Sequence, residues 1–150
     1  MRAVVQRVIE ADVTVDGMIT GRIENGLTVL LGVENGDSDA DVNYITKKIA
    51  NLRVFDDENG VMNRSVTEIG GSILIVSQFT LLGDVRKGNR PSYFAAAAPE
   101  TAKALYRSVV SKLKGDFQIP VEEGVFQAEM LVRIYNNGPV TILLDSRRLF

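Results

Sequence analysis

Two short segments place reactive or conformationally special residues where the surrounding pattern predicts plain strands. Residues 77–80 read SQFT and end a run of Ile and Val with two hydroxyls, an amide and an aromatic ring. Residues 137–141 read NGPVT, and an X-Pro bond is where a cis peptide costs least. Each segment alone also has a simpler explanation: a strand end with outward hydroxyls and a tight turn. Their groups could bind a substrate or orient a carbonyl.

The composition restricts the chemistry that these segments could perform. The 150 residues include no Cys and no His. A thiol nucleophile, an imidazole base, a Ser-His-Asp triad and a Cys/His zinc site are therefore excluded. An enzyme with this sequence must use hydroxyls, carboxylates, Lys, a carboxylate-held metal, backbone dipoles or the substrate itself. The acids within residues 56–60 lack the spacing of a calcium loop and are typical of a solvated turn.

The two segments belong to a wider set of motifs that resembles the D-aminoacyl-tRNA deacylase family. The resemblance covers essentially the whole chain, with the motifs in the family's order. Four separated motifs at the expected spacing are a specific signal, which none of them is alone. They are Gln6-Arg7-Val8, residues 77–81, Arg90-Pro91-Ser92 and residues 138–141, with Met62-Asn63 and Gly70-Gly71-Ser72 also fitting.

The resemblance implies a homodimer that hydrolyses the ester between a D-amino acid and tRNA. The catalysis expected for it needs no metal or other cofactor. In the family, the SQFT segment forms the pocket for the tRNA 3′ end, so Ser77, Gln78, Phe79 and Thr80 are the expected catalytic residues. Gly138 and Pro139, joined by a cis peptide, would enter the partner's pocket, and Arg7 would brace their turn. Two residues depart from the family pattern: Asn137 replaces the usual Asp, and Tyr93 stands where Phe is common.

An aminoacyl ester needs little catalytic help, because its α-ammonium group and the neighbouring ribose 2′-hydroxyl already activate it. Backbone N–H groups around Phe79 and Thr80 could stabilise the oxyanion, and the 2′-hydroxyl of the terminal adenosine could help to activate water. The Thr80 hydroxyl is a competing nucleophile, but it has no evident base.

A grip on the α-ammonium group by the Gly138 and Pro139 carbonyls would explain the selectivity for D-amino acids. It would fix the substituents of the substrate Cα, so that an L side chain strikes the wall while a D side chain does not. A clash of this kind can discriminate more strongly than a missing methylene. Glycine offers no side chain to exclude, so glycyl-tRNA should also be hydrolysed.

The charge distribution predicts limited contact with nucleic acid. The net charge is −2, which disfavours broad binding, and no DNA partner is expected. Arg86, Lys87 and Arg90 form a basic loop beside the SQFT segment and are the expected tRNA contacts, whereas Arg147 and Arg148 are typical surface charges. Two rival functions remain: a related deacylase that removes a mischarged L-amino acid, and a noncatalytic nucleic-acid-binding protein.

The strands and helices that the sequence predicts around these residues form one α+β domain over residues 1–150. We predict a mainly antiparallel, curved or barrel-like sheet with two packed amphipathic helices. Asp16-Gly17 is a hairpin signal, and Ser38 and Pro99 are helix starts. No apolar run is long enough to span a membrane and no signal peptide is evident, which favours a cytoplasmic location. Strands are expected over 3–8, 13–15, 26–33, 72–82, 130–135 and 140–144, the last two interrupted at 136–139.

Overall fold

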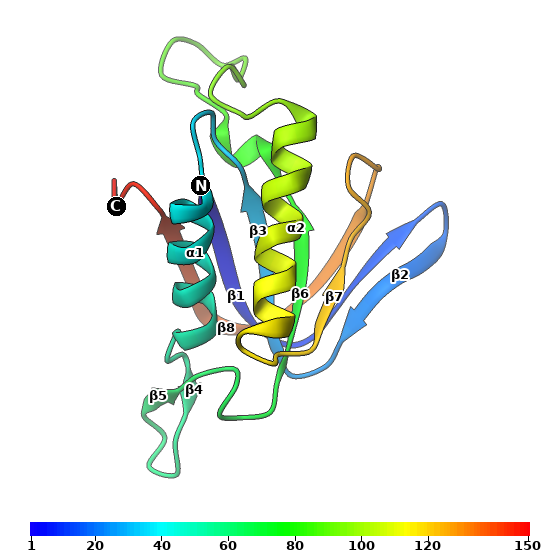
Figure 1. The fold of residues 1–150 in the computed structure, drawn as a ribbon. Helices are drawn as coiled ribbons and strands as arrows, with labels where there is room; N and C mark the ends of the chain where they lie inside the picture. Colours follow the sequence, from blue (N-terminus) through cyan, green and yellow to red (C-terminus); the bar gives the residue numbers. More distant parts are fainter.

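The computed structural model describes residues 1–150 and contains one mixed sheet, two α-helices and a small separate hairpin. The two helices lie side by side over one face of the sheet (Figure 1). No helix is both long and apolar enough to cross a membrane. In chain order the elements are β1 (Arg2–Val15), β2 (Met18–Ile23), β3 (Gly26–Gly32), α1 (Asp39–Asn51), β4 (Phe55–Asp56), β5 (Met62–Arg64), β6 (Ser72–Ser77), a 3₁₀ helix η1 (Phe79–Leu82), α2 (Pro99–Gly115), β7 (Val121–Glu123) and β8 (Leu131–Asp145).

The long strand β1 organises the sheet. It pairs with β8 along one side, and with β3 and then β2 along the other, always antiparallel. The order β2-β1-β3-β6-β7 continues through two parallel pairs, β3–β6 and β6–β7. The barrel-like α+β fold is confirmed, and most of the strand pairing is antiparallel as predicted, but the two parallel pairs make the sheet a mixed one. Parallel neighbours need a long crossover, and α1 and α2 lie in the two connections that supply one.

The predicted interruption before Val140 is a bulge within one strand and not a turn between two strands. Asn136 pairs with Val8 and Thr141 pairs with Gln6, so the intervening residues of β8 bow out opposite Arg7. Gly138 and Pro139, joined by a cis peptide, are exposed in this bulge. The bulge therefore presents the Gly-Pro segment on a paired strand.

The main core lies between the sheet and the two helices. Helix α1 begins after Ser38, whose N–H donates to the Asp41 carboxylate at 2.8 Å, and Pro99 opens α2 as predicted. The apolar faces of both helices then meet one face of β3 and β6. Fully buried residues of this core include Leu27, Val29, Val42, Ile45, Ile49, Ile73, Ile75, Val109 and Leu113.

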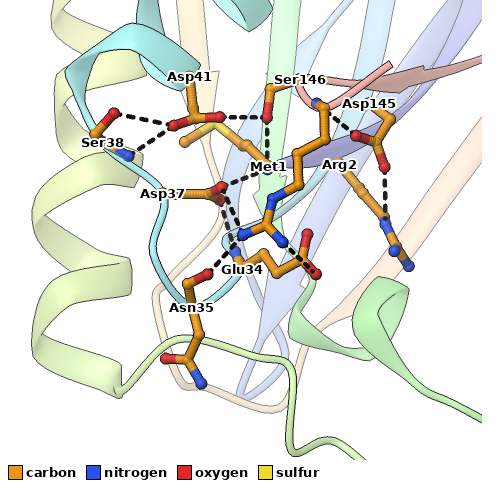
Figure 2. Close-up of polar contacts among 10 residues, drawn as sticks. Met1, Arg2, Glu34, Asn35, Asp37, Ser38, Asp41, Asp145 and Ser146 are labelled. Carbon is orange, nitrogen blue, oxygen red and sulfur yellow. Dashed lines mark hydrogen bonds and ion pairs between the residues drawn. The ribbon is translucent and has the colours of Figure 1, made fainter. Parts of the chain in front are cut away.

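A second, polar cluster ties the start of β1 to the segment after β3 and to the end of β8 (Figure 2). The Met1 ammonium group contacts Asp37 at 2.7 Å and the Ser146 hydroxyl at 2.8 Å, and the side chains of Met1 and Asp37 are fully buried. Arg147 contacts Glu34 at 3.2 Å and donates to the Asn35 carbonyl at 2.6 Å. Arg147 is thus structural, which corrects its assignment as an ordinary surface charge.

Replacing Asp37 by Asn is expected to lower the free energy of unfolding by roughly 3 kcal/mol, because it leaves the buried ammonium group without its charge partner. Urea unfolding at neutral pH measures this change. Asp39→Asn is the matched control, since Asp39 is exposed in the first turn of α1 and should alter stability much less. Equal effects of the two substitutions would contradict a special role for the buried pair.

Candidate functional site

A cavity of about 520 Å³ lies between the end of β6, the start of α2 and the segment that enters β8. Three residues of the SQFT segment, Ser77, Gln78 and Phe79, form part of its wall. The remaining lining residues are Leu31, Val33, Val76, Ala96, Ala97, Pro99, Ala102, Tyr106, Phe126, Gln127, Ala128, Met130 and Val132. The cavity is therefore largely apolar, with a few polar groups concentrated on one wall.

The SQFT segment changes conformation where the sequence predicted a continuous strand. β6 ends at Ser77, the Gln78 N–H donates to the Leu31 carbonyl at 2.7 Å, and η1 follows. The first N–H groups of a helix have no partner within it. The N–H groups of Phe79 and Thr80, the first two of η1, accordingly have no acceptor within the helix and none in the adjoining turns, which makes them candidate donors to a ligand. The Thr80 hydroxyl accepts from the Gln78 amide and does not line the cavity.

Gly32, a residue that the sequence analysis did not select, allows η1 to pack against β3. A Cβ at Gly32 would lie 2.6 Å from the Leu82 side chain and 2.8 Å from the Gln78 carbonyl. Only Gly fits this approach, so Gly32 allows the SQFT segment to pack directly against the end of β3. Arg2 adds a second tie, since it donates to the Leu81 carbonyl at 3.3 Å and pairs with Asp145. A Gly at the end of a buried strand was the available sequence signal.

No charged side chain lines the cavity. Its only phenol, Tyr106, is buried and donates to the Ile75 carbonyl at 3.1 Å. Burial raises the pKa of Tyr106, which keeps the hydroxyl protonated at neutral pH. The cavity of one chain therefore offers hydroxyls, amides and backbone N–H groups but no side-chain base.

Arg7 holds the backbone around Gly138 and Pro139. Its guanidinium donates to the Asn137 carbonyl at 3.2 Å and to the Val54 carbonyl at 2.7 Å. The Asn136 amide closes the bulge by donating to the carbonyls of Arg7 and Val140. Because Arg7 contacts the main chain of residue 137, the Asn found there in place of Asp leaves this contact intact.

The Gly-Pro bulge and the SQFT segment are far apart within one chain. The residues that line the cavity include none of Gly138, Pro139 and Arg7. Ser77 pairs with Leu31 on β3, and both Leu31 and Leu144 of β8 pair with Ala3 on β1. Ser77 and Leu144 therefore lie at the same position along the strands of the sheet. Pro139 is five residues before Leu144, or roughly 17 Å along the strand at about 3.3 Å per residue. The two predicted parts of the site could therefore meet only between two copies of the chain.

The basic loop contains one paired and two unpaired cations. Arg86 binds both carboxylate oxygens of Asp84, at 2.9 and 2.7 Å. The side-chain and backbone hydrogen bonds from Arg86 lower the pKa of Asp84 to about 2. Lys87 and Arg90 are exposed and form no ion pair. Of the three predicted tRNA contacts, only these two carry uncompensated charge.

Two residues that the sequence analysis did not assign to the site, Tyr93 and Gln127, contact or line the cavity wall. Tyr93 packs edge-on against Phe79 with ring centroids 5.0 Å apart, so the ring at position 93 does the same packing that Phe could do. Gln127 lines the cavity with a φ of 67°, a left-handed conformation that is uncommon for a residue other than Gly. No periodic pattern marks Gln127, because it lies between β7 and β8.

These features define a barrel-like mixed-sheet protein whose two helices cover one face and whose apolar cavity has the start of η1 at its wall. A solved structure described as c-Myc DNA Unwinding Element Binding Protein shares this architecture with a TM-score of 0.92 and 43% identity, over 97% of this chain and 98% of that one. A second, described as a probable eukaryotic D-amino acid tRNA deacylase, shares the fold with a TM-score of 0.76 and 18% identity, over 95% and 97% of the two chains.

The sequence comparisons identify the family within this fold. The family model described as D-Tyr-tRNA(Tyr) deacylase matches residues 4–145. The D-aminoacyl-tRNA deacylase of Desulfitobacterium hafniense is 57% identical over 150 residues, which cover all of both chains. The chain belongs to the D-Tyr-tRNA(Tyr) deacylase family, a family of hydrolases, and the resemblance seen in the sequence is confirmed.

Proposed function

We propose that the chain hydrolyses the ester of D-aminoacyl-tRNA, with the terminal nucleotide of the tRNA held in the 520 Å³ cavity. One observation carries this proposal: the SQFT segment forms a wall of an apolar cavity and leaves the Phe79 and Thr80 N–H groups free. Apolar walls suit a nucleobase, and two neighbouring N–H groups without a partner in their helix suit a developing oxyanion. Ser77 and Gln78 add polar contacts at the same wall.

The complete site in this proposal contains parts of two chains. The cavity lacks Gly138 and Pro139, whereas both are exposed on β8 with their backbone held by Arg7 and Asn136. An exposed, braced backbone segment is suited to contact a second copy of the chain. In a homodimer with a two-fold axis, each Gly-Pro bulge would enter the partner's cavity and both sites would be completed together.

Hydrolysis in such a site depends on positioning and on the substrate's own groups. The N–H groups of Phe79 and Thr80 would stabilise the oxyanion; one such donor contributes about 2.7–4 kcal/mol. The cavity has no side-chain base, so the ribose 2′-hydroxyl next to the ester would help to activate water. The partner's Gly138 and Pro139 carbonyls would accept hydrogen bonds from the α-ammonium group, so that an L side chain collides with the main chain and a D side chain does not.

A deacylation assay with D-tyrosyl-tRNA and L-tyrosyl-tRNA tests this function. The proposal expects rapid release of D-tyrosine and no acceleration for the L ester. Preference for the L ester would favour a deacylase of L-amino acids. Binding without hydrolysis of either ester would favour a nucleic-acid-binding role such as the name of the c-Myc-related neighbour suggests, although the net charge of −2 counts against DNA binding.

Thr80→Ala is expected to retain activity within about tenfold of the wild type, because the hydroxyl lies outside the cavity wall and is already bonded to Gln78. Steady-state kinetics with D-tyrosyl-tRNA measure the change. Thr80→Pro serves as the contrasting variant, since it removes the backbone N–H and should lower kcat much further. A trapped acyl ester on Thr80 would identify the hydroxyl as the nucleophile and contradict this prediction.

Binding of tRNA should depend on few phosphate contacts, with a slope of log K against log salt on the order of −2 to −4. Replacing Lys87 and Arg90 together by Ala should make this slope shallower by about 1.4–1.8, at about 0.7–0.9 per contact. Arg86→Ala should have less effect, since Asp84 already neutralises that guanidinium. Filter binding at several salt concentrations gives the slopes. A steeper slope than expected would indicate a phosphate-binding surface elsewhere.

A further inference from the structure

Phe94 presents an aromatic ring to solvent at the edge of the candidate site. Its exposed fraction is 91%, larger than that of any other large apolar residue of the chain. Single exposed apolar residues are common on protein surfaces and carry no meaning by themselves. The backbone that holds this ring and the groups on either side of it distinguish Phe94 from the other exposed residues.

The backbone at Phe94 is fixed by the segment that follows β3. The Asn35 amide donates to the Phe94 carbonyl at 3.1 Å, and the Asn35 N–H donates to the Ala95 carbonyl at 2.8 Å. Asn35 is in turn held by Arg147, within the cluster that includes the buried Met1 ammonium group (Figure 2). The ring therefore extends from a turn that is closed by the Ala96 N–H on the Tyr93 carbonyl and anchored by Asn35, and its exposure does not result from a loose loop.

The anchored ring lies between the cavity and the unpaired cations. After Phe94 in the chain, Ala96 and Ala97 line the cavity. Directly before it, Tyr93 packs against Phe79 of the cavity wall. The loop that leads to Tyr93 contains the uncompensated charges of Lys87 and Arg90. Aromatic rings beside cations that can follow a phosphate backbone are the usual composition of a single-strand binding surface.

We propose that Phe94 is a stacking platform for the unpaired nucleotide that precedes the terminal nucleotide of the tRNA. This inference rests on the proposed function, in which the terminal nucleotide occupies the cavity. The next nucleotide toward the 5′ side would then leave the cavity mouth beside Phe94, with its phosphate toward Lys87 and Arg90. Every base has a π-face, so stacking on Phe94 needs no particular sequence and suits an enzyme that accepts many tRNAs.

The test compares two substrates with the Phe94→Ala variant: D-tyrosyl-tRNA, and D-tyrosyl-adenosine, which lacks the preceding nucleotide. We expect kcat/KM to fall on the order of tenfold for the tRNA ester, since stacking a base on an aromatic ring has an effect of this size. The adenosine ester should be hydrolysed as fast as by the wild type. Phe94→Trp should retain activity on tRNA, and Phe150→Ala, which removes another exposed ring, should change neither substrate.

Three results would overturn the stacking role. The first is unchanged activity of Phe94→Ala on the tRNA ester, and the second is an equal loss on both substrates, which would place the ring's effect inside the cavity. The third is a loss of dimer in light scattering, which would make Phe94 an interface residue. Each leaves the proposed function standing if the wild type hydrolyses both D esters. A wild type inactive on both would refute the proposed function and this inference together.

Discussion

Replacing Gly138 by Ala should lower D-aminoacyl-tRNA deacylation by about a hundredfold or more, the size of effect caused by a misplacement near 1 Å in a reacting complex, while the subunit stays folded. Within its own chain, a Cβ at Gly138 would meet only the Asn136 side chain, at 3.3 Å. A small shift of that amide relieves the contact. In the proposed dimer, however, the same methyl group would enter the space reserved for the substrate's α-ammonium group. Kinetics with D-tyrosyl-tRNA, together with thermal unfolding, measure both parts.

Gly115→Ala is the matched control for Gly138→Ala. Gly115 ends α2 with open space around its Cα, so its substitution should leave both stability and activity close to wild type. Full activity and full rejection of the L ester by the Gly138 variant would mean that another element reads the chirality of the substrate. A Gly138 variant that unfolds at a much lower temperature would show instead that the methyl group disturbs the bulge itself.

A mixture of two inactive variants tests whether the site is shared between chains. Phe79→Ala damages the cavity wall, whereas Gly138→Ala damages the segment that would enter the partner's cavity. In a mixed dimer, one site would combine the intact cavity of one chain with the intact Gly138 of the other. Activity should therefore reappear after the two variants are unfolded and refolded together. A mixture as inactive as its parts would contradict the exchange of Gly-Pro segments.

Local sequence patterns predicted the elements that depend on neighbouring residues. The helix starts at Ser38 and Pro99 and the hairpin at Asp16-Gly17 occur where expected, because each depends on a few adjacent residues. The parallel pairing of β3 with β6 depends on residues more than 40 positions apart. No local period encodes such a pairing, so the mainly antiparallel character of the sheet could be predicted but its two parallel pairs could not.

In the candidate site too, contacts between neighbouring residues could be predicted from the sequence, whereas contacts between residues far apart in the chain could not. Family resemblance selected Ser77, Gln78 and Phe79, which the structure places on one cavity wall. The role of Gly32 depends on a close approach to Gln78 from another strand, which one sequence does not reveal. The pairing of Arg86 with Asp84 joins residues only two positions apart, so the partial compensation of charge in the predicted tRNA-binding loop was visible in the sequence.

Removing the ribose 2′-hydroxyl from the terminal adenosine should lower kcat for the D-tyrosyl ester by about a hundredfold to ten-thousandfold, the range typical of acid–base assistance. The reason lies in the cavity, whose wall includes no charged side chain and whose only phenol, Tyr106, is held protonated by burial. A protein without a base at its ester site must obtain that assistance from the substrate. The test substrate is tRNA that ends in 2′-deoxyadenosine and is charged with D-tyrosine through its 3′-hydroxyl. Steady-state kinetics compare it with natural D-tyrosyl-tRNA, and KM is expected to change little.

The 2′-hydroxyl also speeds spontaneous hydrolysis of the ester, so each enzymatic rate must be divided by the rate in buffer. tRNA with the 2′-hydroxyl removed only from the preceding nucleotide is the control, and should behave as the natural substrate in kcat. If the corrected rate is unchanged, the protein makes no particular use of the terminal hydroxyl, and positioning with the Phe79 and Thr80 N–H groups must account for the whole acceleration. A corrected fall of the expected size would instead make the terminal ribose a working part of the catalytic site, because no side chain of the cavity could replace it.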